Sequence, residues 1–230
     1  YVVDFGKRLI NDRRYGSPRP NSYVMRNEQF ACHDKAVSHF KNGGNQFLVN
    51  AKMRFGKTFT AYHIAKSIAA KKVLVLTYKP QVEFGWAEDL ATHVDFDGWE
   101  YYYAKDFDAG TTIDLPGTAK TEVLFASFQD LNDMSKKKWE NITSYDFDLL
   151  VIDEQHYGAS TPKAQKTLEA LSFKHILEVS GTPLHALMSG KFLDEEVYSW
   201  TYADEQRERR LEKAGGWVTE IYRWLPSMKF

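Results

Sequence analysis

The 230-residue sequence has little of several features that define other classes of protein. Its single cysteine, Cys32, excludes an internal disulfide framework and fits a reducing compartment such as the cytoplasm. No apolar run approaches the roughly 20 residues of a membrane span, and the first residues lack the apolar core of a signal peptide. Neither charge sign is in excess, since 30 Lys and Arg residues meet 31 Asp and Glu residues. The composition predicts a cytoplasmic globular protein with no membrane partner, in which nucleic-acid binding would need a local site.

Short apolar runs alternate with segments of helical period along most of the chain. Strands are expected at 46–50, 73–77, 99–103, 122–127, 148–153 and 175–180. Helices are expected at 27–41, 57–70, 81–93, 128–138 and 162–171. Apolar runs without alternation are typical of strands covered on both faces. The pattern therefore predicts an α/β fold with a doubly wound, mostly parallel sheet flanked by helices.

The sequence divides into three regions. Residues 1–22 include a basic, Pro-rich stretch (NDRRYGSPRPNS) and read as a leader or linker, whereas residues 23–200 carry the alternating pattern. After Gly181 the chain turns charged and is expected to be helical through DEEVYSWTYADEQRERRLEKAG. Residues 201–230 are thus a helical extension that ends in a strand-like exit segment, GWVTEIYRW. A chain that opens on Tyr1 rather than Met suggests a piece of something longer.

The segment AKMRFGKT at 51–58 matches the phosphate-binding pattern G-x-x-x-x-G-K-[ST], except that Ala51 replaces the first glycine. It follows a predicted strand and opens a predicted helix, where backbone N–H groups can converge on phosphate oxygens. Lys57 would bring a positive charge to the β- and γ-phosphates, and the Thr58 hydroxyl could bind Mg²⁺. The ATP-binding residues expected in this loop are Met53, Arg54, Phe55, Gly56, Lys57 and Thr58.

A second segment, DLLVIDEQH, carries a buried strand to Asp153 and Glu154 at its C-terminal end, where open α/β sheets bind ligands. One carboxylate, Asp153, can hold Mg²⁺ while Glu154 orients the attacking water, as phosphoryl transfer requires. Two acids at a strand end are also compatible with helix-N-terminal charges. The phosphate-binding pattern about a hundred residues upstream favours catalysis. A third strand ends in VSGTP, which supplies the hydroxyls of Ser180 and Thr182, although the same residues also suit a plain turn.

The three segments together resemble the first motor domain of superfamily 2 helicases, a RecA-like P-loop NTPase fold, over about residues 23–183. AKMRFGKT is similar to motif I, DEQH to motif II and SGTP to motif III. The resemblance implies that His156, Ser180 and Thr182 couple the motifs to one another. Arg26 and Gln29, in RNEQ, resemble the Q motif, whose glutamine reads the adenine edge.

Two further segments lie where the resembling family contacts nucleic acid. LTYKP lies in the position of motif Ia, and ASFQ resembles a later strand-end motif. In the family such segments hold the sugar-phosphate backbone through hydroxyls and main-chain amides. The nucleic-acid-binding residues that this implies are Thr77, Tyr78, Lys79, Ser127 and Gln129. Hydroxyls at strand ends are common without any such role.

The variants DEQH and SGTP resemble restriction-type helicases (type III restriction helicase subunits) more than DEAD-box RNA helicases. The resemblance implies ATP and Mg²⁺ as cofactors, and DNA rather than RNA as the partner, in a restriction-modification or phage-related enzyme. It also implies a second RecA-like domain in the same polypeptide, and methylase or nuclease subunits as further partners. An isolated chain is expected to be inactive because the family's arginine fingers lie in that second domain. The alternatives are a nucleotide-dependent binding module without turnover, and an RNA helicase.

The seven histidines are scattered along the sequence. None stands in an H-x₃-H pair, and the lone cysteine has no partner at a metal-ligand spacing. Sequence spacing alone therefore predicts no structural metal site.

Overall fold

The computed structural model describes residues 19–78, 82–104, 115, 117, 119–133, 136–153, 162–181 and 190–213. In this part of the chain, seven strands form one sheet in the order β3-β4-β2-β5-β6-β1-β7, and every neighbouring pair is parallel. The strands are β1 (Gln46–Ala51), β2 (Lys72–Thr77), β3 (Trp99–Tyr103), β4 (Thr121–Ser127), β5 (Asp146–Asp153), β6 (Ser172–Ser180) and β7 (Val197–Trp200). The predicted fold class, a parallel α/β sheet, is confirmed.

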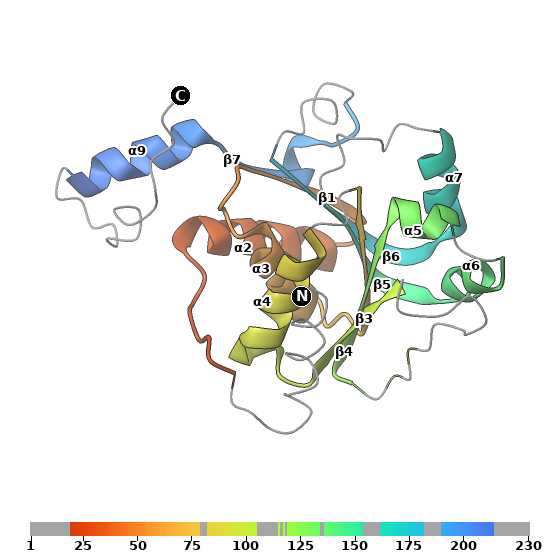
Figure 1. The fold of residues 1–230 in the computed structure, drawn as a ribbon. Coiled ribbons are helices and arrows are strands. Elements are labelled where there is room, and N and C mark those ends of the chain that lie inside the picture. Colours follow the sequence, from red (N-terminus) through yellow and green to blue (C-terminus); the bar gives the residue numbers. More distant parts are fainter. Residues whose placement is uncertain are drawn as a thin grey trace.

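Helices cover both faces of the sheet (Figure 1). One face carries α2 (Asn27–Lys41), α3 (Lys57–Ser67) and α4 (Glu83–Thr92). The other carries α5 (Phe128–Asp133), α6 (Lys136–Thr143) and α7 (Pro162–Ala170). Two short 3₁₀ helices, η2 (Val94–Phe96) and η5 (Asp194–Glu196), precede β3 and β7. None of the described helices is long and apolar enough to cross a membrane.

The sheet separates two apolar cores. Val73 and Val75 of β2 join the cluster that includes residues of α2, α3 and α4, whereas Leu74 and Leu76 join the cluster on the opposite face. Successive side chains of a strand point to opposite faces, so an apolar strand of this kind is buried on both sides. This arrangement explains why the strands read as continuous apolar runs rather than as alternating ones.

The segment after β6 differs from the prediction. Val197–Trp200, expected to be helical, forms β7 parallel to β1 at the edge of the sheet. The side-chain amide of Asn50 donates to the Ser199 hydroxyl across this pair at 3.0 Å. Valine, tyrosine and tryptophan suit a strand, and pairing with β1 outweighs the charged sequence on either side.

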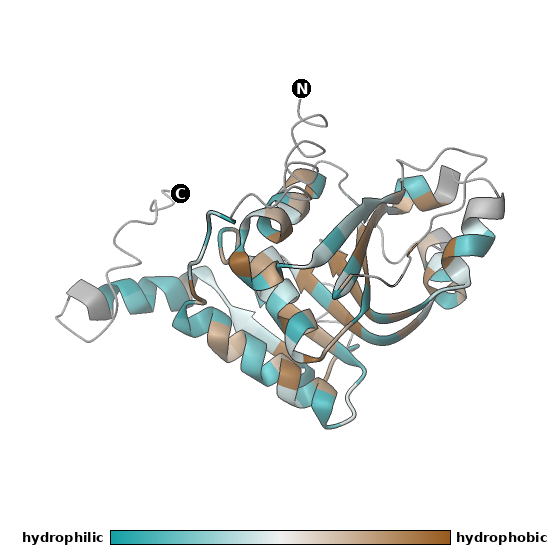
Figure 2. Ribbon diagram, turned by 90° about the horizontal axis from the view of Figure 1, so that it is seen from below, coloured by the Kyte–Doolittle hydropathy of each residue, from teal (hydrophilic) through white to brown (hydrophobic). Residues whose placement is uncertain are grey.

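The predicted helix begins only after β7. Thr201 and Asp204 cap its first turn reciprocally, because the Asp204 carboxylate accepts from the Thr201 N–H at 2.8 Å and the Thr201 hydroxyl accepts from the Asp204 N–H at 3.3 Å. The helix that follows, α9 (Tyr202–Lys213), extends away from the sheet and is hydrophilic (Figures 1 and 2).

Part of the expected leader packs on the domain. The Asn21 N–H donates to the Thr92 carbonyl at 3.1 Å, and the Asn21 carbonyl accepts from the Val94 N–H at 2.9 Å. The Arg19 guanidinium donates to the His93 carbonyl at 3.0 Å, which satisfies an acceptor at the end of α4. Residues 1–18 and the expected exit segment lie outside the described residues.

Asp89 on α4 provides a test of how strongly burial of a charged carboxylate destabilises the fold. Burial, aided by the negative charge of Glu88, raises the pKa of Asp89 to about 6. A carboxyl group whose folded-state pKa is raised contributes stability at low pH, and that contribution is lost as pH rises through the folded-state pKa. We therefore expect Asp89→Asn to increase the free energy of unfolding at pH 7.5 by up to about 3 kcal/mol.

The measurement for Asp89→Asn is urea unfolding of both proteins at pH 4 and pH 7.5. The advantage of the variant should shrink toward pH 4, because Asp89 itself is then protonated in the folded state. A pH-independent difference would show that the effect comes from packing and not from ionisation.

Candidate nucleotide-binding site

The loop between β1 and α3 has the backbone geometry of an anion-binding turn. Gly56 has a φ of +86° and Arg54 a φ of +66°, so the chain turns sharply before α3 begins at Lys57. The Gly56 carbonyl accepts from the Thr60 N–H at 3.0 Å as the first turn closes. The loop therefore leads directly into the N-terminus of α3, the end of a helix that attracts anions such as phosphate.

Lys57 lies over this loop. Its ammonium donates to the Ala51 carbonyl at 3.0 Å and to the Lys52 carbonyl at 3.5 Å. The two carbonyls hold the side chain beside the turn. Its positive charge therefore lies close to the place where an anion would bind at the N-terminus of α3. The loop thus follows β1 and opens α3, as the pattern predicted, and a role for Lys57 in phosphate binding stays a prediction.

The start of α2 braces the same loop. The Phe55 carbonyl accepts from the Gln29 side-chain amide at 2.8 Å and from the Arg26 guanidinium at 2.5 Å. The Gln29 amide oxygen accepts from the Arg26 N–H at 2.8 Å, which fixes the amide orientation. A Cβ atom on Gly56 would lie 2.4 Å from Gln29 Nε2, and the φ of +86° disfavours any side chain, so both features favour glycine at this position. Reading of an adenine by Gln29 stays a prediction.

The remaining loop candidates differ in exposure. The Phe55 ring is buried in the core and only its backbone lies in the turn, whereas Met53 is 65% exposed. Arg54 is exposed and Thr58, in the first turn of α3, is half-buried. The backbone of the turn, together with Lys57 and Thr58, therefore forms the ligand-facing part of the loop.

The acidic strand end lies at the same edge of the sheet. Asp153 is the last residue of β5, and its neighbours in register are Thr77 of β2 and Val179 of β6. Ser180 of β6 is opposite Asn50 of β1, so a single strand separates the loop from the acidic strand end. The carboxyl ends of parallel strands share one edge, and ligands of open α/β sheets bind there.

Four predicted site residues lie outside the described part of the chain. They are Glu154, His156 and Thr182, and Lys79 among the nucleic-acid contacts. Their neighbours in sequence, Asp153 and Ser180, are 7% and 1% exposed at the ends of adjacent strands.

A residue that the sequence did not single out orients Asp153. The indole Nε1–H of Trp86, on α4, donates to Asp153 Oδ2 at 3.0 Å, and both side chains are buried. Trp86 is 67 residues away in sequence. No local pattern signals this pair, and only the fold of α4 over the sheet brings the two groups together.

Trp86→Phe should destabilise the chain by about 1.5–3 kcal/mol, because a buried charged acceptor loses a hydrogen-bond donor. Trp99→Phe is the matched control, since Trp99 lies in the same core cluster and its indole has no hydrogen-bond partner among the described residues. Urea unfolding of both variants measures the difference. Equal losses would show that Trp86 contributes packing alone.

Lys52 ties the nucleotide-binding loop to the C-terminal elements. Its N–H donates to the Trp200 carbonyl of β7 at 3.1 Å, and its ammonium forms an ion pair with Glu205 of α9. Arg209 of α9 also contacts the Glu205 carboxylate, at 3.0 Å. The first residue after β1 is therefore held by the segment that leads away from the domain.

A comparison with known families decides the affiliation. The model of the type III restriction enzyme res subunit family (ResIII) matches residues 22–185, well over half of the chain. The chain belongs to this family. Membership implies that the res-subunit domain uses a nucleotide.

One relative of this chain is a Mycoplasma pneumoniae protein named as the C-terminus of a type II restriction enzyme and methyltransferase. It is 28% identical over an alignment of 238 positions, which covers 83% of this chain and 33% of that protein. The chain thus spans about a third of the length of that relative.

Solved structures share the fold. The Sulfolobus solfataricus SWI2/SNF2 ATPase core domain matches with a TM-score of 0.55 and 17% identity, over 74% of this chain and 34% of that one. The same core in complex with dsDNA matches with a TM-score of 0.53 and 16% identity, over 73% and 34%. At these identities the likeness establishes the RecA-like fold of the res-subunit domain.

Among the predicted nucleic-acid contacts, Thr77 ends β2, Tyr78 follows it, Ser127 ends β4 and Gln129 lies on α5. Thr77 and Ser127 are buried, and the Ser127 hydroxyl caps α5 by accepting from the Asp130 N–H at 2.9 Å. Tyr78 stacks on Phe128 with ring centroids 4.1 Å apart. Gln129 is exposed, and Lys79 lies outside the described residues. The capping geometry accounts for Ser127 without a ligand, and nucleic-acid contact by this set stays a prediction.

Proposed function

We propose that this chain is the ATP-binding motor domain of a DNA helicase or translocase in a restriction-modification enzyme. One observation carries the proposal: a glycine turn with Lys57 and a buried carboxylate, Asp153, at the same sheet edge with one strand between them. Such an edge can seat a triphosphate against a helix N-terminus and hold a carboxylate near its terminal phosphate.

The chain's own residues divide the work of hydrolysis. The turn and the α3 N-terminus bind phosphate oxygens, and Lys57 leaves its loop carbonyls to offset negative charge on the β- and γ-phosphates. Glu154 orients the water that attacks the γ-phosphorus in line with the departing ADP oxygen. His156, Ser180 and Thr182 would couple this site to neighbouring elements.

The donors for a magnesium ion are a hydroxyl and a carboxylate, the oxygen ligands that Mg²⁺ prefers. Thr58 would contribute the hydroxyl from the start of α3, and Asp153, held by Trp86, the carboxylate from the end of β5. When bound, the ion supplies positive charge to the phosphate oxygens.

The partner is inferred to be DNA. The Mycoplasma relative is named for restriction and methylation, and one structural neighbour is an ATPase core in complex with dsDNA. Both support DNA over RNA, and the name of the relative supports cooperation with nuclease or methylase subunits. The chain covers about a third of each of these proteins, which is compatible with the second RecA-like domain that we propose in the same polypeptide. A cytoplasmic location accords with DNA as the partner.

The test is ATP turnover by the full-length protein alone, with duplex DNA, and with duplex RNA. We expect stimulation by DNA well above that by RNA. ATP binding without turnover in any condition would favour a nucleotide-dependent binding module, and stimulation by RNA alone would reassign the substrate.

A further inference from the structure

Two histidines and an aspartate that are scattered in the sequence meet in space. His63 lies on α3, His93 follows α4, and Asp95 lies in η2. Asp95 Oδ2 lies 3.6 Å from His63 Nε2 and 3.5 Å from His93 Nδ1. One ligand atom from each residue falls within 4.8 Å of the other two. We call this group the His63–His93–Asp95 cluster.

The hydrogen bond on the far side of His93 prepares it to bind a metal. Its Nε2 is 2.7 Å from the Tyr23 carbonyl, which can only accept, so Nε2 carries the proton. The lone pair is therefore on Nδ1, the atom that faces Asp95. The Asp95 N–H donates weakly to it at 3.2 Å, a bond that a metal would replace. A ring N–H donated to a backbone carbonyl is the usual support for a ligating histidine.

The ring of His63 has a nitrogen atom that lacks a hydrogen-bond partner among the described residues. This atom, Nε2, is buried. A buried polar atom without a partner costs free energy that a ligand at that atom would recover. The imidazole is held between aromatic rings, with Phe59 4.4 Å and Phe96 5.1 Å away between centroids, so its direction is fixed.

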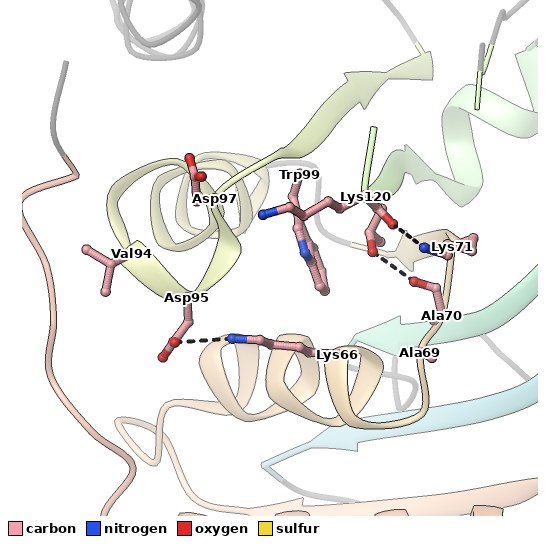
Figure 3. A pocket seen from close by; sticks show the side chains of 10 residues that line it. Lys66, Ala69, Ala70, Lys71, Val94, Asp95, Asp97, Trp99 and Lys120 are labelled. Atoms are coloured by element: carbon pink, nitrogen blue, oxygen red, sulfur yellow. Dashed lines mark hydrogen bonds and ion pairs between the residues drawn. The ribbon is translucent and has the colours of Figure 1, made fainter. Parts of the chain in front are cut away.

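Asp95 connects the cluster to solvent. Its Oδ1 accepts from the Lys66 ammonium at 3.1 Å, which leaves Oδ2 on the side of the two histidines. Asp95 and Lys66 also line a cavity of about 440 Å³ at the starts of β3 and β4, with Trp99 and Lys120 on its far side (Figure 3). The Asp95 side chain is 41% exposed, so solvent reaches the carboxylate. The candidate nucleotide-binding site lies at the opposite edge of the sheet, at the carboxyl ends of β1 and β5.

We propose that the His63–His93–Asp95 cluster is a second metal site, one for Zn²⁺ or a similar transition ion. Tetrahedral zinc with bonds of about 2.0–2.1 Å places its ligand atoms roughly 3.3 Å apart. The separations of Asp95 Oδ2 from His63 Nε2 and His93 Nδ1, 3.6 and 3.5 Å, are close to this value. Two imidazoles and a carboxylate are ligands of this class, whereas Mg²⁺ prefers oxygen alone. The ion would join α3 to the α4–β3 connection and, through His93, to Tyr23.

The experiment is calorimetric titration of the metal-free 230-residue chain with Zn²⁺, together with thermal unfolding at each metal concentration. We expect one equivalent of Zn²⁺ to bind and to raise Tm by several degrees, with no equal effect of Mg²⁺. Co²⁺ in place of Zn²⁺ should give the visible absorption of a four-coordinate site. Absence of both heat and Tm shift with Zn²⁺ would overturn the proposal.

Variants distinguish this cluster from adventitious histidine binding. His63→Gln and Asp95→Asn should each weaken Zn²⁺ binding at least tenfold, whereas His175→Gln, a half-buried histidine on β6, should leave it unchanged. Lys66→Met should tighten binding, because the competing ammonium is removed. Should His63→Gln unfold, the partly exposed Asp95→Asn still decides the matter. Wild-type affinity in Asp95→Asn, or equal weakening in His175→Gln, would refute the site.

Discussion

Replacing Lys57 with alanine is expected to weaken ATP binding by about 10- to 100-fold, the value of one lost charge-assisted hydrogen bond of about 1.5–3 kcal/mol. The ammonium already lies over the loop, 3.0 Å from the Ala51 carbonyl, so no large movement is needed to reach a bound phosphate. Truncation removes this charge and leaves the turn at Gly56 in place. Titration with a fluorescent ATP analogue measures the change.

Glu154→Gln is the informative comparison for Lys57→Ala. The amide keeps the shape of the side chain but loses the carboxylate's charge and basicity, so binding should be near normal while hydrolysis stops. Lys41→Ala, at an exposed lysine that ends α2, controls for the general loss of positive charge. Equal loss of ATP affinity in Lys57→Ala and Glu154→Gln would show that Glu154 binds nucleotide and does not orient water.

The parts of the site that the sequence predicted are those built from contiguous residues. A buried strand that runs directly into Gly56, Lys57 and Thr58, or into Asp153, fixes both the element and the end of it that carries the chemistry. The parallel sheet then places these ends together, because all carboxyl ends of its strands share one edge. Local sequence was sufficient here because each motif contains its own supporting strand.

Pairs made by tertiary packing were not predictable in this way. The Trp86–Asp153 hydrogen bond and the His63–His93–Asp95 cluster join residues on different elements. The spacing of these residues along the sequence gives no sign that they are in contact. The strand Val197–Trp200 was missed because its charged neighbours suggested a helix, while its stability comes from pairing with β1. The T-x-x-D capping sequence at Thr201 is the local signal that could have moved the helix start to Tyr202.

The ion pair between Lys52 and Glu205 bears on how the domain would work in a larger motor. It joins the nucleotide-binding loop to α9, the hydrophilic helix that extends from β7 away from the sheet (Figures 1 and 2). Both side chains are largely buried, at 14% and 5% exposure, so solvent screens the pair weakly. A rearrangement of the loop on ATP binding would therefore move the start of α9 through this ion pair. We propose that the second RecA-like domain would respond to that movement.

The 230-residue chain by itself is expected to hydrolyse ATP about 10³- to 10⁵-fold more slowly than the full-length protein, the range that an arginine finger contributes. The proposed second domain would supply that arginine. In the described part of α9, Arg207 is paired with Asp204 at 3.2 Å and Arg209 with Glu205 at 3.0 Å, so each is held by an acid of its own helix. Arg26 is likewise bound to Glu28 and to the Phe55 carbonyl.

Steady-state ATPase assays on the chain and on the full-length protein, at saturating ATP and with duplex DNA, measure this difference. Binding of ATP by the chain, followed separately, distinguishes a slow chemical step from an unformed site. Comparable turnover by the two proteins would contradict the missing arginine. In that event Arg54, which is exposed in the nucleotide-binding loop itself, becomes the first candidate. Arg54→Ala in the isolated chain would then have to abolish the observed rate while leaving ATP binding intact, because a finger acts on the transition state and not on the bound ground state.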